Sequence, residues 1–201
     1  VSADSMQIYK DMNIGTAKVT KEEMKGIKHY LIDRVYPNER YSVAQFKEDA
    51  EKAIRTILEE GKVPIVVGGT GLYINSLIYN IHYEDTKIDE EYRKFLEKRV
   101  EEEGLETLYQ EAKVIDEEAT RKISEKDQKR ILRILELYHQ TGKTKTQLEI
   151  ESRKEEPKYD YRVFGLHWER EVLYDRINQR VNQMLKQGLI QEVETIWKKY
   201  K

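Results

Sequence analysis

The chain has 201 residues and a formal net charge of −2, with 38% apolar and 37% charged residues. This length and apolar content are typical of a folded domain with one sizeable core and exclude an intrinsically disordered chain. The absence of cysteine excludes a disulfide framework and a zinc site built on thiolates, and no apolar run approaches the roughly 18 residues of a membrane span.

Strand and helix patterns alternate at the start of the chain. Residues 1–3 are predicted to end a strand, and a short helix with an acidic first turn follows over 20–26. Residues 29–35 form a second predicted strand. Ser42 then caps a longer helix, which runs to Gly61 because its apolar side chains recur at helical spacing.

Residues 63–67 complete a strand–helix–strand unit. They are mostly β-branched and lack polar alternation, as in the buried strands of parallel sheets. Gly68 and Gly69 then make a tight turn, and Thr70 takes the N-cap position of a helix over 72–78. This order predicts an α/β domain with a parallel sheet.

A change of composition separates the middle of the chain from this domain. Residues 89–151 are rich in Glu, Lys, Leu and Arg, which favours helices, and breaks fall at Gly104, near Asp116 and at Gly142. Strand character returns at 161–166, and two further helices are predicted over 169–186 and from 190 to the end. The predicted division is therefore an α/β core over 1–88 and 158–201, incomplete at both ends, and a helical insertion over 89–151.

Asp4 and the turn at 68–70 each follow a predicted strand. Ligands of open parallel sheets bind beyond the carboxyl ends of the strands, so we expect both segments to face one crevice. A carboxylate there can orient an amine through a hydrogen bond and accept its proton. Ser5 and Gln7 supply further donors and acceptors. By position alone, a turn or cap role for Asp4 is the alternative.

A basic group falls on one predicted helix of the insertion. Lys129, Arg130 and Arg133 are three or four residues apart, with Lys126 nearby, so they share a face while Ile131, Leu135 and Tyr138 can face the core. Such side chains hold nucleic-acid phosphates without reading sequence. The near-neutral net charge requires that any such binding be local, and a solvated helix surface is the alternative.

Two arginines after the last predicted strand are candidates for an anion. Arg176 and Arg180 are four residues apart on one helix and therefore lie on one face. Pairing with Asp175 or Glu171 is the alternative. The four histidines show no ligand spacing, so we predict no metal bound by the protein itself.

Several short segments in a fixed order carry the most specific pattern in the chain. They are 1–18, with Asp4-Ser5-Met6-Gln7, then 29–33, 41–46, 67–73, 129–133 with 135–136, and 141–144. Together they resemble the tRNA dimethylallyltransferases, also called tRNA isopentenyl diphosphate transferases. These enzymes attach a dimethylallyl group to an adenine beside the tRNA anticodon.

The resemblance implies a nucleotide-binding fold of P-loop kinase-like type with a helical insertion. It also implies a cytoplasmic and monomeric Mg²⁺-assisted transferase, not bound to membranes, that uses dimethylallyl diphosphate and the tRNA anticodon stem-loop. Asp4 is then the catalytic residue, and Arg176 and Arg180 approach the diphosphate. The implied tRNA contacts are Asp4, Ser5, Met6, Gln7, Thr70, Arg93, Lys129, Arg130, Ile131, Leu132 and Arg133.

The chain departs from the family pattern at both ends. Family members carry a phosphate-binding P-loop ahead of the segment that starts at Val1, and they continue past Lys201. We therefore expect a piece of a longer protein, inactive without its P-loop. Three alternatives fit parts of the pattern: an adenylate isopentenyltransferase that uses a free nucleotide, a small-molecule kinase of the same fold, and a non-catalytic RNA-binding module.

Overall fold

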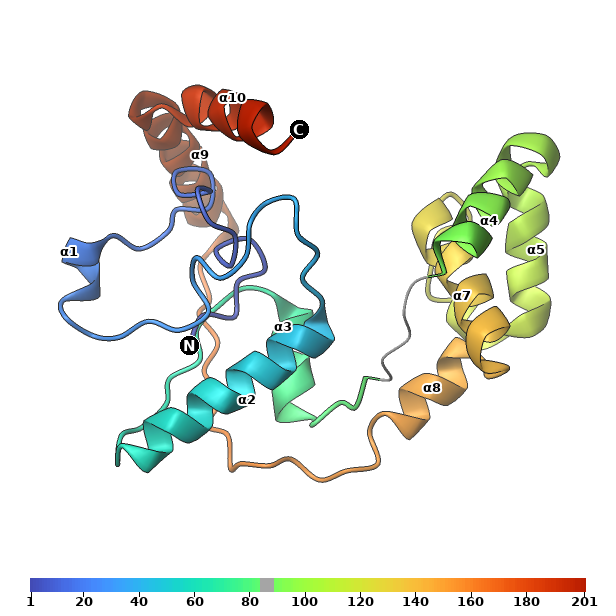
Figure 1. Ribbon diagram of the computed structural model, residues 1–201, viewed down its shortest axis with the longest axis horizontal. Helices are drawn as coiled ribbons and strands as arrows, with labels where there is room; N and C mark the ends of the chain where they lie inside the picture. Colours follow the sequence, from blue (N-terminus) through green and yellow to red (C-terminus); the bar gives the residue numbers. More distant parts are fainter. Residues whose placement is uncertain (84–88) are drawn as a thin grey trace. The chain divides into compact units, whose positions relative to one another are not determined.

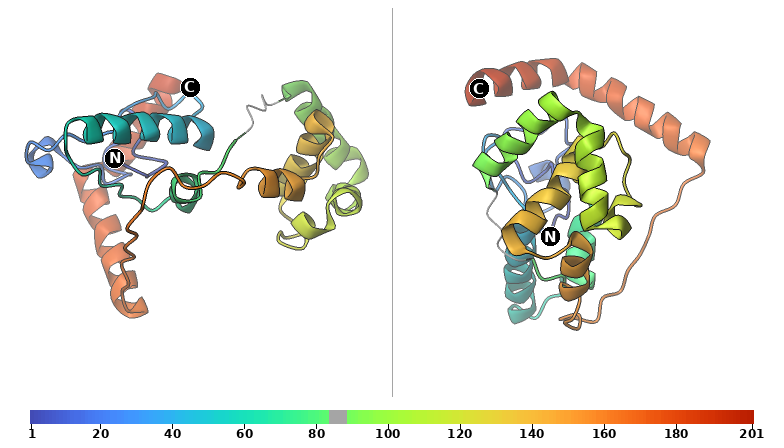
Figure 2. Two further views of the ribbon diagram at one scale, coloured as in Figure 1. Left: turned by 90° about the horizontal axis from the view of Figure 1, so that it is seen from below. Right: turned by 90° about the vertical axis from the view of Figure 1, so that its right-hand side faces the viewer.

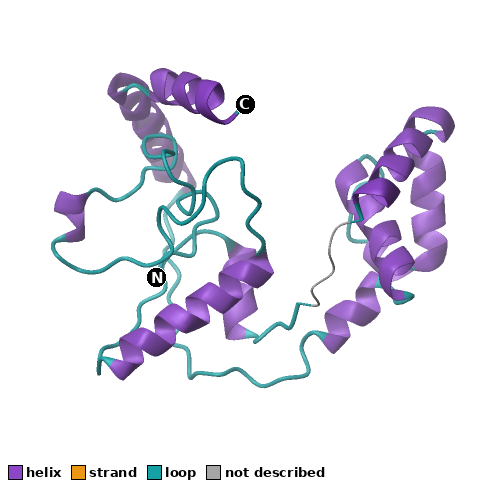
Figure 3. Ribbon diagram, in the orientation of Figure 1, coloured by secondary structure: helices purple, strands orange, loops and turns teal. Residues whose placement is uncertain are grey.

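A computed structural model describes residues 1–83 and 89–201, and the chain divides into two compact units (Figure 1). The core unit comprises Val1–Asn80 and Pro157–Lys201, and the helical unit comprises Ile81–Glu156. The described residues consist of helices and loops (Figure 3). None of the helices in the described part of the chain combines the length and apolar character that a membrane crossing needs.

The helices of the core unit begin and end at local signals. Ser42 and Gln45 form a reciprocal capping box at the start of α2, and the cap of α1 at Thr20 has the same form. Gly188, at φ 100°, separates the last two helices. The helices are α1 (Lys21–Met24), α2 (Val43–Glu59), α3 (Gly71–Ile78), α9 (Arg170–Gln187) and α10 (Leu189–Tyr200).

The core of this unit lies between α2, α3 and the first residues of the chain. The rings of Phe46 on α2 and Tyr73 on α3 stack with their centroids 3.9 Å apart. Ala3 and Ile8 are buried against the same cluster. Burial of these side chains therefore holds the N-terminal segment against the two helices.

The parallel arrangement expected of the predicted strands is present as two isolated parallel bridges, Ser2 with Val67 and Tyr9 with Val35. Residues 1–3 lie between two neighbours, because the Ala3 N–H donates to the Val67 carbonyl at 2.7 Å and the Ser2 N–H donates to the Tyr30 carbonyl at 2.9 Å. The pairing is too short for a strand to be assigned among the described residues.

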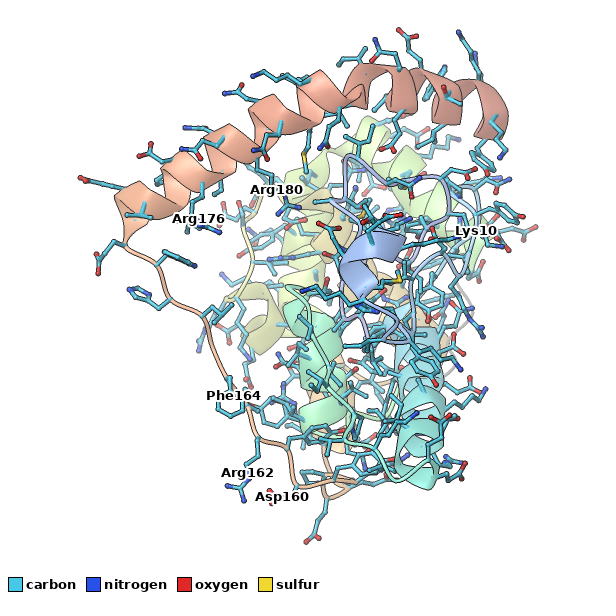
Figure 4. All side chains as sticks on the ribbon, turned by 90° about the vertical axis from the view of Figure 1, so that its left-hand side faces the viewer. Lys10, Asp160, Arg162, Phe164, Arg176 and Arg180 are labelled. Carbon is cyan, nitrogen blue, oxygen red and sulfur yellow. The ribbon has the colours of Figure 1, made fainter. Side chains whose placement is uncertain are left out.

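The predicted strand at 161–166 is not formed and is replaced by an unpaired segment that leads to α9 (Figure 4). Tyr161 packs against the core, but Phe164 and Leu166 remain in solvent, 90% and 94% exposed. An extended segment becomes a strand only where another backbone accepts and donates its hydrogen bonds, and no described segment does so here. Residues 29–35 and 63–67 differ in another way, because each pairs with the N-terminal segment only through isolated bridges, which are too short for a strand to be assigned.

The helical unit packs α4, α5 and α7 together around one apolar cluster (Figures 1 and 2). Helix boundaries fall at the predicted breaks, since α4 ends before Gly104 at φ 85° and α7 ends before Gly142 at φ 67°. Leu96, Leu108 and Leu132 are fully buried in the cluster. The helices are α4 (Glu90–Glu103), α5 (Leu105–Ile115), α6 (Glu117–Thr120), α7 (Gln128–Thr141) and α8 (Lys145–Glu151).

Asp116 connects α6 to α8. It caps α6 by accepting from the Ala119 N–H at 3.0 Å, and it accepts from the Thr146 N–H at 2.8 Å and the Thr146 hydroxyl at 2.7 Å. Asp116 is 5% exposed. Burial opposes its ionisation, but the hydrogen bonds from Thr146 and Ala119 outweigh burial and lower the pKa of Asp116.

We expect Asp116→Ala to destabilise the helical unit by about 2–4 kcal/mol, because three donors lose a buried acceptor. Asp127→Ala is the matched control. Asp127 caps α7 through one backbone N–H, and its loss should lower stability by about 1 kcal/mol. Urea unfolding of the whole chain, followed by amide protection in α7, measures both changes. Equal losses would contradict the role assigned to Asp116.

The same contacts predict a pH dependence. A carboxyl group whose pKa is lower in the folded state adds stability above its unfolded pKa of about 3.9. That stability is lost as the pH falls through the lower folded pKa. We expect the wild-type chain to lose more unfolding free energy between about pH 5 and pH 2 than Asp116→Ala does.

Candidate active site

Asp4 stands directly after the paired segment 1–3 and is half-buried. Its Oδ1 atom accepts from the Met6 N–H at 2.8 Å and from the Gln7 N–H at 3.2 Å. These bonds fix the carboxylate on a turn. No hydrogen bond to Oδ2 is found among the described residues, so the expected turn role is observed and it engages Oδ1.

Thr70 connects the second predicted site segment to the first. Its hydroxyl oxygen accepts from the Ser5 N–H at 2.9 Å and lies 3.2 Å from the Ser5 hydroxyl. The Thr70 N–H donates to the Ala3 carbonyl at 3.2 Å. Thr70 occupies the N-cap position of α3 but makes no side-chain cap bond. Its hydroxyl therefore holds the Asp4 turn, and Thr70 has the predicted N-cap position without the side-chain bond of a cap.

Gly68 allows this close approach. A Cβ atom at this position would lie 2.2 Å from the Ala3 carbonyl oxygen and 2.8 Å from the Ala3 Cα atom. Real Cβ atoms do not approach a backbone so closely. At Gly69 nothing lies within 4 Å of such an atom. The first glycine of the pair is thus required by packing.

Gln7 and Met6 complete the predicted turn. The Gln7 amide Nε2 donates to the Thr16 carbonyl at 3.2 Å and is 3.4 Å from the Ala17 carbonyl. Gln7 is therefore engaged with the loop that follows it. Met6 is 46% exposed and points away from the core.

Tyr73 is a site residue to which the sequence interpretation gave no role. It is 5% exposed, and burial, with the nearby Tyr9 and Asp4, raises the pKa of its hydroxyl. A neutral phenol therefore lies within electrostatic reach of the Asp4 carboxylate. The available signal was its place in the 67–73 segment, three residues after Thr70, which puts both at the first turn of α3.

Arg176 and Arg180 lie on the same side of α9 (Figure 4). Both side chains are exposed. The Arg176 guanidinium stacks 4.5 Å from the centroid of the Trp168 ring. Neither arginine forms an ion pair with Asp175 or Glu171 in the described part of the chain, and no described contact joins them to the Asp4 turn.

The helical unit holds the basic residues. Lys129 and Arg130 are exposed, and the Arg130 Nε atom lies 3.3 Å from Asp127 Oδ2. Arg93 and Arg133 both meet the buried carboxylate of Glu136, with N–O distances of 2.7 and 3.6 Å. A hollow of about 620 Å³ lies beside them, lined by Arg93, Glu97, Ser124, Lys126, Asp127, Gln128 and Lys129.

The two apolar residues of the predicted tRNA-contact segment 129–133 are buried, unlike its first two charged residues. Ile131 and Leu132 are 0% exposed and belong to the core of the helical unit. Tyr138 was expected to face that core with Ile131, but it is 43% exposed. The exposed residues of α7 are Gln128, Lys129, Arg130, Tyr138 and His139, whereas the charged Glu136 is buried.

Comparison with known proteins gives one consistent result. The sequence profile of the IPP transferase family matches residues 7–201. The tRNA dimethylallyltransferase of Acetivibrio thermocellus is 54% identical over 196 residues, which are 98% of this chain and 63% of that protein. That of Caldanaerobacter subterraneus is 48% identical over 200 residues, 98% of this chain and 64% of that protein.

Solved structures agree with these relatives. The full-length tRNA isopentenylpyrophosphate transferase of Bacillus halodurans has a TM-score of 0.62 and 42% identity, covering 98% of this chain and 60% of its own. A eukaryotic dimethylallyltransferase acting on tRNA has a TM-score of 0.78 and 30% identity, covering 100% of this chain and 49% of its own. The chain thus spans less than two thirds of the length of the proteins it resembles.

Proposed function

The chain belongs to the IPP transferase family, and from this premise we propose that the full-length protein transfers a dimethylallyl group to tRNA. The donor is dimethylallyl diphosphate, and the acceptor is the exocyclic N6 amine of an adenine beside the anticodon. The similarity to curated tRNA dimethylallyltransferases over 98% of the chain supports this proposal. The observation that carries it is the Asp4 carboxylate, which is held on its turn through Oδ1 and accepts no described hydrogen bond at Oδ2.

In the proposed reaction, the N6 atom attacks the allylic carbon of the donor. A C–N bond forms, the C–O bond to the diphosphate breaks, and the inorganic diphosphate leaves. The amine becomes cationic as it is alkylated and loses its proton to Asp4, whose Oδ2 atom accepts no hydrogen bond from the described residues. The fixed turn orients the carboxylate before the reaction, which reduces the entropy lost in reaching the transition state.

We assign the remaining predicted contacts as parts of the same proposal. A flipped adenine is held by groups around the Asp4 turn, namely Ser5, Met6, Gln7 and Thr70. Arg176 and Arg180, which have no acidic partner in the described structure, meet the diphosphate charge. The α7 surface holds tRNA phosphates through Lys129, Arg130 and Arg133, with Arg93 at its side.

Mg²⁺ is also part of the proposal, but the described residues do not build a site for it. They contain no group of three or more His, Cys, Asp or Glu side chains placed to bind one ion. Mg²⁺ commonly binds through substrate phosphates with one or two carboxylates, so we propose that it binds together with the diphosphate. No step here is routed through the ion.

We propose further that the full-length protein completes a parallel sheet of P-loop kinase-like type. The two parallel bridges support this arrangement. So do the exposed apolar side chains of Val63, Ile65 and Phe164, which are 83%, 69% and 90% accessible in extended segments. We also propose a monomeric, cytoplasmic enzyme whose helical unit contacts tRNA.

Transfer of label from dimethylallyl diphosphate tests the function directly. The full-length protein, with Mg²⁺, is offered an anticodon stem-loop with an adenine at the target position, or AMP. We expect label in the stem-loop alone. Label in AMP would identify a nucleotide prenyltransferase instead, and label in neither would contradict the proposal.

Removal of three positive charges tests the proposed RNA-binding surface of α7. We expect Lys129→Ala, Arg130→Ala and Arg133→Ala together to weaken stem-loop binding and to reduce the slope of log K against log salt by about 2, because each lost phosphate contact removes about 0.7–0.9. Filter binding at several salt concentrations measures the slope.

The matched control removes the same charge elsewhere on the helical unit. Lys98, Lys113 and Lys122 are exposed on α4, on α5 and after α6. Their joint replacement by alanine should leave most of the slope in place. An equal loss of slope in both triple variants would show that net charge, and not the α7 surface, governs binding.

A further inference from the structure

Glu192 of α10 binds three consecutive backbone amides of a loop far away in the sequence. Its Oε2 atom accepts from the Asn13 N–H and the Ile14 N–H, each at 2.8 Å, and its Oε1 atom accepts from the Gly15 N–H at 2.9 Å. Charged acceptors make stronger hydrogen bonds than neutral ones. One carboxylate therefore fixes the conformation of the loop.

Gly15 permits the close approach of α10 to this loop. A Cβ atom at Gly15 would lie 3.1 Å from the Leu189 Cδ1 atom and 3.6 Å from Glu192 Oε1. The far end of α10 is held too, because Lys199 Nζ donates to Asp11 Oδ2 at 2.7 Å and the Tyr200 hydroxyl donates to the same atom. Loop 11–15 is thus joined to both ends of α10.

The same loop continues into the candidate active site. Gln7 donates from its side chain to the Thr16 carbonyl and from its backbone to Asp4 Oδ1. Hydrogen bonds and a short backbone segment therefore connect Glu192 to the carboxylate of Asp4 through Gln7.

Helix α10 also anchors α9, which carries Arg176 and Arg180 and is called the arginine helix below. Gly188 lies between α9 and α10, which follow one another at the C-terminal end of the chain (Figure 2). Among the described helices, α10 makes the main helix contact with α9. Met184, near its C-terminal end, is the buried residue of α9 among those described. Fixing α10 on loop 11–15 thus sets the base from which α9 carries Arg176 and Arg180.

We propose that Glu192 is a positioning residue for transfer, which holds the Asp4 turn and the arginine helix in one arrangement by binding loop 13–15. This inference rests on the proposed function, because it assigns Glu192 to the same reaction. Glu192 acts through the loop and is not itself a catalytic residue. A carboxylate that served stability alone would change the unfolding free energy and leave the rate of the folded protein unaltered.

The test compares Glu192→Ala and Glu192→Gln with the control Glu194→Ala in the full-length protein. Glu194 is exposed on the same helix, so its loss removes the same charge without touching the loop. Single-turnover transfer to the stem-loop is measured with the enzyme in excess and at saturating concentration, so that the rate constant does not depend on the folded fraction.

We expect Glu192→Ala to lower this rate constant at least tenfold, or about 1.4 kcal/mol in activation free energy, with little change in tRNA affinity. Glu192→Gln keeps one accepting oxygen and should recover part of the rate. Glu194→Ala should transfer at the wild-type rate. An unchanged rate in both Glu192 variants would overturn the proposal.

A double-mutant cycle tests the route through Gln7. If Glu192 acts through the loop, combining Glu192→Ala with Gln7→Ala should lower the rate less than the product of the two single effects. Fully independent effects would contradict this route.

Hydrogen exchange measures the contact between Glu192 and loop 13–15 without an activity assay. The amides of Asn13, Ile14 and Gly15 should lose protection in Glu192→Ala and keep it in Glu194→Ala. Unchanged protection would show that Glu192 does not hold these amides in solution and would overturn the proposal. A wild-type protein with protected amides but no transfer would instead refute the proposed function, and the positioning role with it.

Discussion

Asp4→Asn in the full-length protein is expected to reduce transfer to tRNA by about 10²–10⁴-fold, the usual contribution of a general base. Asparagine retains a carbonyl oxygen that can accept from the Met6 and Gln7 N–H groups, so the turn is preserved. It cannot take up the proton that N6 loses. Binding of the stem-loop should remain, because the residues proposed to bind its phosphates belong to the helical unit.

Comparison of Asp4→Asn with Asp4→Ala separates the two roles proposed for this carboxylate. Alanine removes both the proton acceptor and the turn bonds, so we expect transfer to be abolished and the chain to lose about 1–2 kcal/mol of stability. Asp160→Asn is the matched control, because the side chain of Asp160 is 85% exposed. Label transfer and urea unfolding measure the effects. Asp4→Asn with wild-type transfer would eliminate Asp4 as the base.

Gly68→Ala is expected to damage both the fold and the site. The new methyl group would lie 2.2 Å from the Ala3 carbonyl oxygen and 2.3 Å from its carbonyl carbon. Because these are backbone atoms, the paired segments must separate, which breaks the bond from the Ala3 N–H to the Val67 carbonyl. We expect a loss of about 3 kcal/mol or more and transfer below detection.

Gly69→Ala provides the matched control for this change. The neighbouring glycine has open space around the position of its Cβ atom and is not among the residues with positive φ. Its replacement should leave stability within about 0.5 kcal/mol of wild type. Urea unfolding of both variants in the whole chain measures the two changes in stability. If the two variants unfold at the same urea concentration, the close approach at Gly68 is not what the fold requires.

The sequence was sufficient for the features that depend on near neighbours. The capping residue Ser42 and the breaks at Gly104 and Gly142 are confirmed. A cap or a helix stop is decided by hydrogen bonds and dihedral angles within about four residues, so the local sequence carries the signal. The order of short motifs likewise identified the family to which the chain belongs.

The local sequence was not sufficient to predict the strands. Residues 161–166 have the apolar and aromatic composition of a strand, but no described segment pairs with them. Strand formation needs a partner backbone, and composition does not specify that partner. On α7, helical spacing correctly placed Ile131 in the core and wrongly placed Tyr138 there. Periodicity identifies the apolar face of a helix, and the neighbouring helices decide how much of that face is buried.

The candidate site divides in the same way. The sequence by itself determined that Asp4, Ser5, Gln7 and Thr70 belong to the predicted site, because their types and spacing form a pattern. Only the tertiary structure decided that the Thr70 hydroxyl binds Ser5, 65 positions away, and that Glu192 binds Gly15 across 177 positions. Such contacts exist because folding brings distant segments together, and no local rule of propensity or spacing contains that information.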